Sequence, residues 1–142
     1  MRLALREADR AAGHDDVPVG AIVAHEGEVI GVGRNERELK GDPTAHAEII
    51  ALREASERIG GWRLERTVLY VTLEPCAMCA GAIVLARVPR VVYATTDPKA
   101  GACGSVLDVT GEHRLNHRPQ VDSGLLAAEA AAQLREFFAA RR

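Results

Sequence analysis

The spacing of apolar residues predicts a helix followed by a β-hairpin at the start of the chain. Apolar side chains recur at helical spacing over residues 2–13, and Gly13 ends this predicted helix. Two strand-like runs, residues 19–24 and 29–33, flank the short sequence His25-Glu26-Gly27-Glu28. Because a turn of this kind joins neighbouring antiparallel strands, we expect the two runs to pair as a hairpin.

The rest of the chain alternates between helical and strand patterns. The expected elements, in order, are a helix over 44–59 that Gly60-Gly61 stops, a buried strand over 68–73, a helix over 76–86, a strand over 90–95 and a last helix striped by Leu126, Ala130, Leu134 and Phe137. This alternation implies crossover connections and a sheet covered by helices on both faces. The expected fold class is therefore α/β, and such sheets bind ligands where strands end and helices begin.

Length and composition narrow the class of protein. The 142 residues, 47% of them apolar and 27% charged, fit one domain over residues 1–142 with a real core. No apolar run approaches the about 18 residues of a membrane span, and Arg6-Glu7 ends the first apolar stretch too early for a signal peptide. Three cysteines cannot all pair with one another. We therefore expect a cytoplasmic protein in a reducing compartment, with no membrane partner.

The distribution of charge along the chain indicates only weakly whether the protein binds nucleic acid. A net charge of −2 argues against indiscriminate binding to nucleic acid. Residues 85–142 carry eight Lys and Arg against six Asp and Glu, whereas residues 1–84 carry ten against fourteen. This bias is equally consistent with ordinary scatter and with a local surface for phosphate groups, which would suit a protein that reads one RNA loop.

The candidate chemistry lies in His46-Ala47-Glu48 and Pro75-Cys76-Ala77-Met78-Cys79. The imidazole of His46 and the thiolates of Cys76 and Cys79 can occupy three corners of a zinc tetrahedron and leave the fourth open for water. Glu48 is then left over, and an acid beside a metal that binds water suits proton transfer. The combination indicates hydrolysis rather than a structural metal.

Local helix geometry decides whether the two cysteines can act together. Cys76 and Cys79 lie at i and i+3, so both thiols share one face of a first helical turn if Pro75 opens that helix. The unpaired N–H groups of a helix start also favour thiolates. Taken alone, this pair could equally be a redox pair, half of a structural zinc site or a pair of core residues.

A second helix start is needed for the histidine. His46 and Glu48 are two residues apart, which is roughly 200° around a regular helix, so they share a site only at a helix tip. We expect that helix to begin with Thr44 as its N-cap, because Asp42-Pro43 disfavours helix before it. Two helix starts would then meet at the metal. Alternatively, Glu48 has no catalytic role and only stabilises the helix dipole as an acidic residue in the first turn.

A His-x-Glu sequence followed by Pro-Cys-x-x-Cys is a known signature of zinc nucleobase deaminases. Beyond this motif, the chain resembles the bacterial tRNA-specific adenosine deaminases over nearly its whole length. The matching segments are Val17-Pro18-Val19-Gly20-Ala21, Gly33-Arg34-Asn35, Asp42 to Ile49, Leu69 to Cys76, Met78 to Ala82, Asp97-Pro98-Lys99, Asn116-His117-Arg118 and Phe137-Phe138. The resemblance implies a three-layer α/β/α cytidine-deaminase-like fold with a mixed sheet of about five strands. It also implies zinc-dependent deamination of adenosine to inosine in tRNA, at the anticodon wobble position.

The resemblance implies roles for individual residues as well. Glu48 would move protons during the reaction. Asn35 would read a purine edge with its amide, and Ala47 would lie against the substrate. Asp97 and Lys99 match a segment that contacts nucleotides flanking the target base, where Lys99 would meet phosphate and Asp97 a ribose 2′-OH. The implied partners are one zinc ion per chain, a tRNA anticodon stem-loop and a second copy of the chain in a homodimer.

Several alternatives remain open at this point. Asn35 could instead satisfy its own loop, and Asp97 to Lys99 could be a plain turn with solvated charges. Cys103 departs from the family, which more often has a small residue there, and we expect it to be a buried apolar filler. A deaminase of a free base or nucleoside would use the same catalytic residues on the same fold. A non-catalytic module with structural zinc is disfavoured by Glu48, for which it would have no use.

Overall fold

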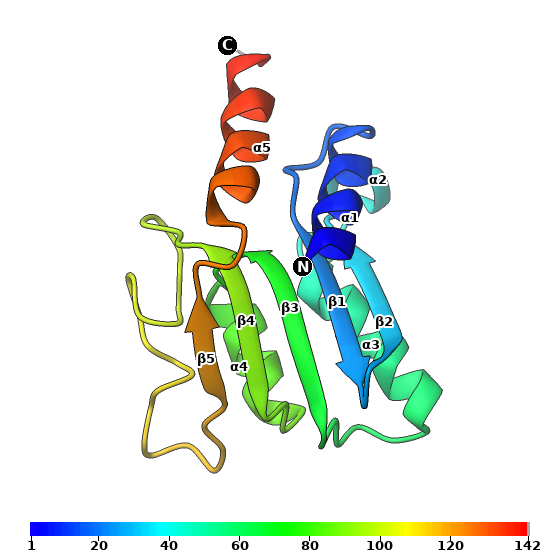
Figure 1. Ribbon diagram of the computed structural model, residues 1–142, viewed down its shortest axis with the longest axis vertical. Coiled ribbons are helices and arrows are strands. Elements are labelled where there is room, and N and C mark those ends of the chain that lie inside the picture. Colours follow the sequence, from blue (N-terminus) through cyan, green and yellow to red (C-terminus); the bar gives the residue numbers. More distant parts are fainter. Residues whose placement is uncertain (142) are drawn as a thin grey trace.

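The computed structural model of the protein describes residues 1–141, and its strands form one mixed sheet (Figure 1). The strands are β1 (Gly20–His25), β2 (Glu28–Arg34), β3 (Thr67–Leu73), β4 (Arg90–Thr95) and β5 (Gln120–Ser123), in the spatial order β2-β1-β3-β4-β5. β1 runs antiparallel to β2 and β3, whereas β3, β4 and β5 are parallel. The carboxyl ends of β2, β3 and β4 therefore point to the same edge of the sheet.

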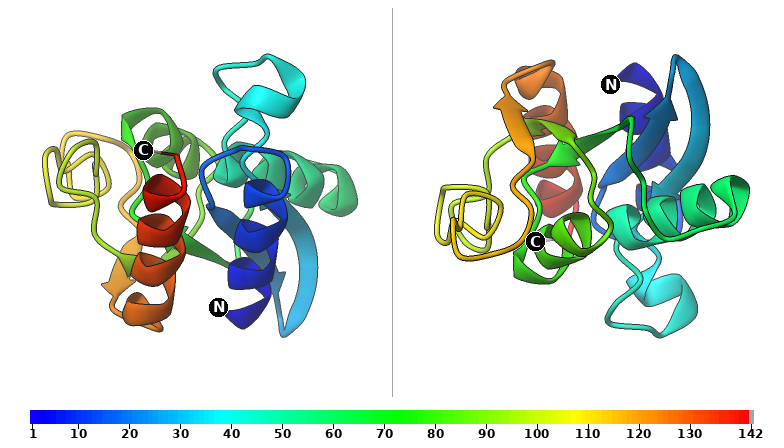
Figure 2. Two further views of the ribbon diagram at one scale, coloured as in Figure 1. Left: turned by 90° about the horizontal axis from the view of Figure 1, so that it is seen from above. Right: turned by 90° about the horizontal axis from the view of Figure 1, so that it is seen from below.

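Helices cover both faces of the sheet, as the sequence predicts. α1 (Arg2–Ala12) and α5 (Ala127–Ala139) lie on one face, and α3 (Ala47–Ile59) and α4 (Ala77–Leu85) lie on the other (Figures 1 and 2). α1 packs on β1 and β2, α5 on β4, and α3 on β2 and β1. This confirms the three-layer α/β/α arrangement.

The main core lies between the sheet and the layer of α3 and α4. Alternate residues of the strands point into it, because successive side chains of a strand point to opposite faces of the sheet. Its buried side chains include Ala21, Val23, Leu69, Val71 and Val91 from the strands and Ala51, Ala55 and Ile83 from the helices. Packing on one side of a sheet in this way fixes the helix starts relative to the strand ends.

α3 approaches β2 so closely that the strand needs glycine. A Cβ atom on Gly33 would lie 2.0 Å from the carbonyl oxygen of Ala47, and one on Gly31 would lie 2.2 Å from that of Ala51. Both obstacles are backbone atoms of the helix, which cannot move aside, and close backbone approach is a recurrent reason for glycine within a strand. The first turn of α3 is thus pressed against the carboxyl end of β2.

The structure corrects the sequence prediction at three places. α3 begins at Ala47 rather than at Thr44, because Oδ1 of Asp42 accepts hydrogen bonds from the N–H and the hydroxyl of Thr44, each at 2.8 Å, and forms a separate turn. The one-turn helix α2 (Arg37–Lys40) and the strand β5 were not predicted. Neither has an apolar pattern of its own, since α2 buries no residue and β5 consists of Gln-Val-Asp-Ser.

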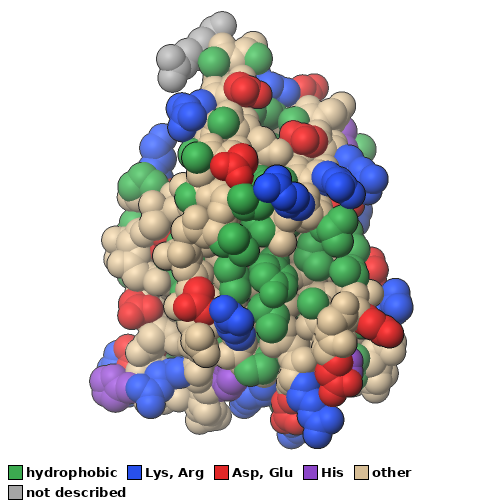
Figure 3. Space-filling view, viewed as in Figure 1, with side chains coloured by type: hydrophobic (Ala, Val, Ile, Leu, Met, Phe, Trp, Pro, Cys, Tyr) green, Lys and Arg blue, Asp and Glu red, His purple; other side chains and the backbone are tan. Residues whose placement is uncertain are grey.

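The face that carries α1 and α5 is only partly covered. Leu5, Ala94 and Ala130 form a small second core cluster where the two helices meet the sheet. Figure 3, which has the same view as Figure 1, shows hydrophobic side chains gathered at the centre of this face. Within residues 1–141 no helix is both long and apolar enough to cross a membrane.

Candidate active site

Two helix starts meet at the carboxyl edge of the sheet. His46 immediately precedes α3 and Cys76 immediately precedes α4, and both have extended backbone, with ψ of 151° and 178°. Neither residue uses its side chain to cap its own helix, although this position commonly does so. The imidazole and the thiol are therefore free to turn toward each other.

His46, Cys76 and Cys79 form a cluster in which the potential metal-ligating atoms lie within 4.8 Å of one another. Nδ1 of His46 lies 3.6 Å from Sγ of Cys76 and 3.5 Å from Sγ of Cys79. Zinc bonds of about 2.1 Å to nitrogen and about 2.3 Å to sulfur, at a tetrahedral angle, would separate such ligand atoms by about 3.6 Å. The predicted donor set therefore fits a zinc ion in both chemistry and spacing.

Close contact within the cluster shifts the proton affinities of its members. A hydrogen bond from Cys79 lowers the pKa of the Cys76 thiol to about 3. The same contact with Cys76 raises the pKa of Cys79, and the hydrogen bond to Cys76 also raises the pKa of His46. Negative charge is thus concentrated on sulfur between two helix starts, an environment that suits a divalent cation.

Glu48 is the buried acid beside this cluster. It is the second residue of α3, the residue is only 4% exposed, and it lines the same cavity as His46 and Cys76. Burial raises the pKa of its carboxyl from 4.5 to about 7. A group with a pKa near the working pH can both accept and release protons, which is the property required of a proton shuttle.

A cavity of about 210 Å³ opens next to the cluster. Five of the predicted site residues line it: Asn35, His46, Glu48, Cys76 and Asp97. The cavity is smaller than the about 300–1,000 Å³ typical of pockets for drug-sized ligands, so it suits one base rather than a whole nucleotide.

Asn35 links two loops at the wall of this cavity. Its Oδ1 accepts a hydrogen bond from the backbone N–H of Ala47 at 3.0 Å, and its Nδ2 donates to the carbonyl of Val17 at 3.0 Å. One Nδ2 hydrogen and one Oδ1 lone pair remain for a ligand. Ala47 itself is fully buried and does not line the cavity.

Asp97 and Lys99 lie in the loop that follows β4. Oδ1 of Asp97 accepts hydrogen bonds from the N–H groups of Lys99 at 3.0 Å and Ala100 at 3.2 Å, so one carboxylate oxygen forms the turn. Lys99 lines a neighbouring hollow together with Phe138, and this hollow shares Asp97 with the cavity at the cluster. The structure thus places Lys99 beside the site rather than within it.

Two charged residues that line the cavity, Glu74 and Arg37, were not predicted from the sequence to have a role. Glu74 is a buried acid between a buried strand and Pro75, and this position was a signal that could have singled it out. Arg37 carries no comparable local signal. Cys103 lies outside the metal-ligating cluster and packs against the main core, but it is only partly buried rather than buried as predicted. Its burial still raises the pKa of its thiol to about 12, which is typical of an unreactive cysteine.

The cluster, the buried acid and the cavity all lie where helices begin at the carboxyl edge of an α/β/α sheet. This combination of fold and site defines a nucleobase deaminase, a hydrolase that replaces an exocyclic amine with oxygen. A family model described as MafB19-like deaminase matches residues 1–142. The comparison supports the class that the geometry defines.

Relatives named tRNA-specific adenosine deaminase match almost the full chain. The Bacillus subtilis relative is 45% identical over 97% of this chain and 86% of its own length. The Haemophilus influenzae relative is 46% identical over 100% of this chain and 83% of its own length. The chain therefore belongs to the family of tRNA-specific adenosine deaminases, as the sequence resemblance predicts.

Solved structures agree with this assignment. A structure from work on A-to-I editing by tRNA:A34 deaminases at the wobble position is 46% identical, with a TM-score of 0.91 over 94% of this chain and 97% of that chain. A guanine deaminase from Nitrosomonas europaea is 26% identical, with a TM-score of 0.82 over 96% of this chain and 81% of that chain. A guanine deaminase from Bacillus subtilis is 37% identical, with a TM-score of 0.66 over 77% and 69%. The fold prediction is confirmed, and the fold is shared by enzymes with different substrates.

Proposed function

We propose that residues 1–142 are one catalytic domain that converts adenosine to inosine in tRNA, at the first anticodon position. The observation that carries this proposal is the match over 94% of the chain, at 46% identity and a TM-score of 0.91, to a structure from work on tRNA:A34 deaminases. The metal cluster alone would not separate this substrate from guanine, because the guanine deaminases share the fold.

His46, Cys76 and Cys79 are proposed to hold one zinc ion per chain. The support is the donor chemistry and the spacing of about 3.6 Å between Nδ1 and the sulfur atoms. His46 and Cys76 line the cavity, whereas Cys79 does not. The cluster therefore faces the proposed substrate cavity through His46 and Cys76. When bound, zinc supplies a Lewis acid that lowers the pKa of water from 15.7 toward about 7.

Glu48 is proposed to carry the protons of the reaction. It takes a proton from the attacking water as the new bond from oxygen to C6 of adenine forms, and it delivers that proton to N1 of the ring. The proton of the new C6 hydroxyl then passes through Glu48 to the exocyclic nitrogen, and the C6–N bond breaks to release ammonia and leave the C6 carbonyl of inosine. The buried position and a pKa near 7 support this role, because the carboxyl must be regenerated in each turnover.

Asn35 is proposed to read the purine with the donor and acceptor that its two internal hydrogen bonds leave free. The fixed amide orientation supports this role, since a preorganised group loses little entropy on binding. Ala47 contributes by donating its N–H to Asn35, and so acts on substrate binding through the orientation of that amide.

The RNA around the target base is proposed to follow the loop after β4. Lys99 offers a cation for phosphate beside the cavity, and Oδ2 of Asp97 makes none of the turn's hydrogen bonds and can accept one from a ribose 2′-OH. Arg37 offers a second cation at the cavity wall. An anticodon stem-loop is the proposed substrate because its loop bases are already partly unstacked. A tRNA substrate also supports the proposed cytoplasmic location.

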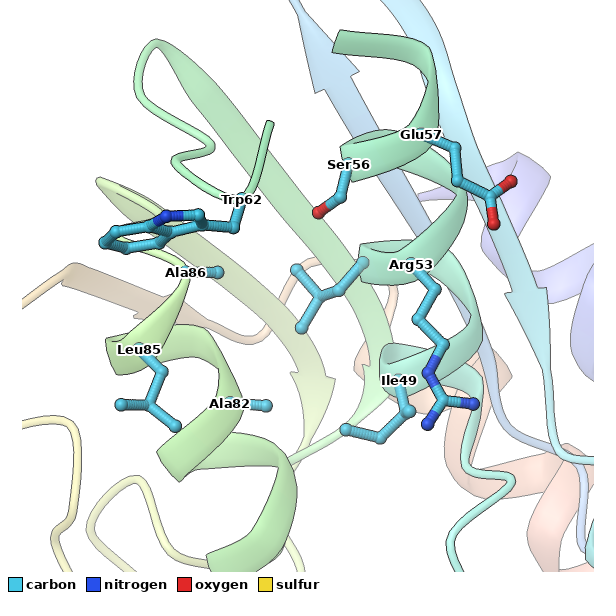
Figure 4. Close-up of a pocket in the computed structure, with 9 residues that line it drawn as sticks. Ile49, Arg53, Ser56, Glu57, Trp62, Ala82, Leu85 and Ala86 are labelled. Atoms are coloured by element: carbon cyan, nitrogen blue, oxygen red, sulfur yellow. The ribbon is translucent and has the colours of Figure 1, made fainter. Parts of the chain in front are cut away.

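A homodimer is proposed, formed through the groove between α3 and α4. This groove, of about 530 Å³, is lined by residues that include Ile49, Trp62, Ala82 and Leu85, and in Figure 4 Ile49 lies on one side of it and the other three on the opposite side. Leu85 is 70% exposed and Trp62 is 53% exposed, whereas Ile83 of the same helix is fully buried in the chain's own core. Apolar groups gathered on an exposed face are typical of a protein interface.

The proposed function is tested by measuring ammonia release and inosine formation. The zinc-loaded enzyme is offered an anticodon stem-loop with adenosine at the first anticodon position, and separately free adenosine, cytidine, cytosine and guanine. We expect turnover of the stem-loop and little turnover of the small molecules. Deamination of guanine or of a free nucleoside without action on the stem-loop would replace the proposal with the small-molecule alternative.

A further inference from the structure

The side chain of Glu74 is enclosed by a segment that lies far from it in the sequence. Glu74 is only 2% exposed and follows β3 directly. Oε1 accepts hydrogen bonds from the N–H of Asp97 at 3.0 Å and from the Ser105 hydroxyl. Oε2 accepts hydrogen bonds from the N–H groups of Cys103 at 3.0 Å and Ser105 at 3.1 Å. Four donors on two oxygens use the acceptor capacity of an ionised carboxylate.

The backbone of the same segment packs directly against this carboxylate. A Cβ atom on Gly101 would lie 2.4 Å from Cδ of Glu74 and 2.5 Å from each of its oxygens. Gly101 also donates its N–H to the carbonyl of Asp97 at 2.9 Å, which closes the loop around the acid. Any side chain at this position would have to displace the carboxylate or the loop.

The segment that Glu74 holds is tied to the metal cluster by a second route. The N–H of Ala102 donates to the carbonyl of Pro75 at 2.8 Å, and Pro75 is followed by Cys76. Glu74 and Pro75 therefore connect the start of α4, which carries two of the three proposed metal ligands, to the loop that carries Asp97 and Lys99. The dipeptide Glu74-Pro75 thus sets the distance between the start of α4 and the loop after β4.

We propose that Glu74 is a positioning residue that fixes residues 97–105 relative to the metal cluster and so sets Asp97 and Lys99 for the RNA that flanks the target base. This inference rests on the proposed function, in which that loop contacts RNA. The proposed role of Glu74 involves no proton transfer. Hydrogen bonds to a charged acceptor are stronger than neutral ones, so one carboxylate can hold a loop in which residues 98–100 and 104–105 are exposed.

The first test is Glu74→Gln, which keeps the size of the side chain but replaces one acceptor oxygen with an NH₂ group. We expect faster hydrogen exchange at the amides of Asp97, Cys103 and Ser105 and unchanged exchange in β1. Zinc content and kcat at saturating stem-loop should stay within about twofold of the wild type, whereas KM should rise about tenfold, the change that 1.4 kcal/mol produces. Unchanged exchange at these amides together with an unchanged KM would overturn the proposal, as would loss of zinc with KM unaltered.

A double-variant cycle with Lys99→Ala makes the test specific. If Glu74 acts through the loop, Lys99→Ala should raise KM much less in the Glu74→Gln enzyme than in the wild type, because the phosphate contact is already weakened. Equal effects in both backgrounds would contradict the proposal. A wild-type enzyme that ignores the stem-loop would refute the proposed function and the RNA part of this inference, while the amide exchange would still decide whether Glu74 holds the loop.

Gly101→Ala provides an independent variant if Glu74→Gln does not fold. The added Cβ atom would overlap the Glu74 carboxylate and displace it from the loop. Gly101→Ala should therefore raise KM and the exchange of the same loop amides. Gly61→Ala is the matched control, because a Cβ atom there meets nothing within 4 Å. An effect of Gly61→Ala as large as that of Gly101→Ala would show that the loop contact is not the cause.

Discussion

Oδ1 of Asn35 accepts a hydrogen bond from the backbone N–H of Ala47 at 3.0 Å. That N–H is one of the unpaired donors at the start of α3, and a side chain at the position of His46 would commonly cap the next N–H groups of the same turn. The preceding residue is His46, whose side chain makes no cap hydrogen bond. Asn35 thus satisfies the helix start from a different loop, and the imidazole of His46 stays available for the metal cluster.

The metal assignment predicts which thiols are needed for zinc. Cys76→Ala and Cys79→Ala should each lose most of the bound zinc, because two remaining ligands cannot complete the site. Cys103→Ala should keep about one zinc per chain, since Cys103 lies outside the cluster. Elemental analysis of the three purified variants, with circular dichroism to check folding, measures this. Full zinc retention in both Cys76→Ala and Cys79→Ala would refute the assignment.

Replacement of Glu48 should abolish turnover while leaving the metal in place. Glu48→Gln keeps the size of the side chain but cannot move protons, and proton transfer by a positioned group is typically worth about 10²–10⁴-fold. We therefore expect kcat to fall by at least about 10²-fold with zinc content unchanged. A zinc-loaded variant with near-normal kcat would remove Glu48 from the mechanism.

The same substitution should stabilise the metal-free protein at neutral and higher pH. Burial raises the pKa of Glu48 from 4.5 to about 7, so ionisation favours the unfolded state as pH rises from about 4.5, and the full penalty is present above about 7. A shift of this size corresponds to about 3 kcal/mol at most. In chelator-treated samples, Glu48→Gln should therefore raise Tm at pH 8 but not at pH 4. A Tm gain that is the same at both pH values would contradict the assigned cause.

Lys99→Ala should weaken RNA binding without disturbing chemistry at the metal. Loss of one phosphate contact should raise the stem-loop KM and reduce the slope of log affinity against log salt by about 1. Zinc content and kcat at saturation should stay unchanged. Arg66→Ala is the control, since Arg66 is 79% exposed and pairs with Glu26 of the β1–β2 turn. A salt slope that Lys99→Ala leaves unaltered would exclude the phosphate contact.

Leu85→Glu should separate the proposed homodimer into monomers. The leucine is 70% exposed in the groove between α3 and α4, so a charge there would cost little in the monomer but would be buried without a partner in the dimer. Light scattering at micromolar concentration measures the change. Leu3→Glu is the control, because Leu3 lies on α1 at the opposite face, and this variant should keep the mass of the dimer. A wild-type protein that is already monomeric would remove the interface from the proposal.

The sequence by itself determined the local features of this protein. The i, i+3 spacing of Cys76 and Cys79 predicts that both thiols share one helical turn, because that geometry depends only on residues within the turn. The apolar patterns predicted the hairpin, β3, α4 and β4 for the same reason, since period and burial are properties of a short window. The family resemblance, carried by motifs along the whole chain, implied the fold and the deaminase class, and the comparisons confirm both.

Only the tertiary structure decided which distant residues meet. The enclosure of Glu74 by the segment that carries Asp97 and Ser105 joins residues that are 23 to 31 positions apart, and no motif predicted it. The meeting of His46 with Cys76, by contrast, was already predicted from the zinc motif, and the structure adds only its distance of 3.6 Å. β5 and α2 also depend on their neighbours, because they have no apolar pattern of their own. Contacts between distant residues form when packing offsets the entropy cost of closing a long loop. Which residues meet in this way is not visible as a periodic pattern in the sequence.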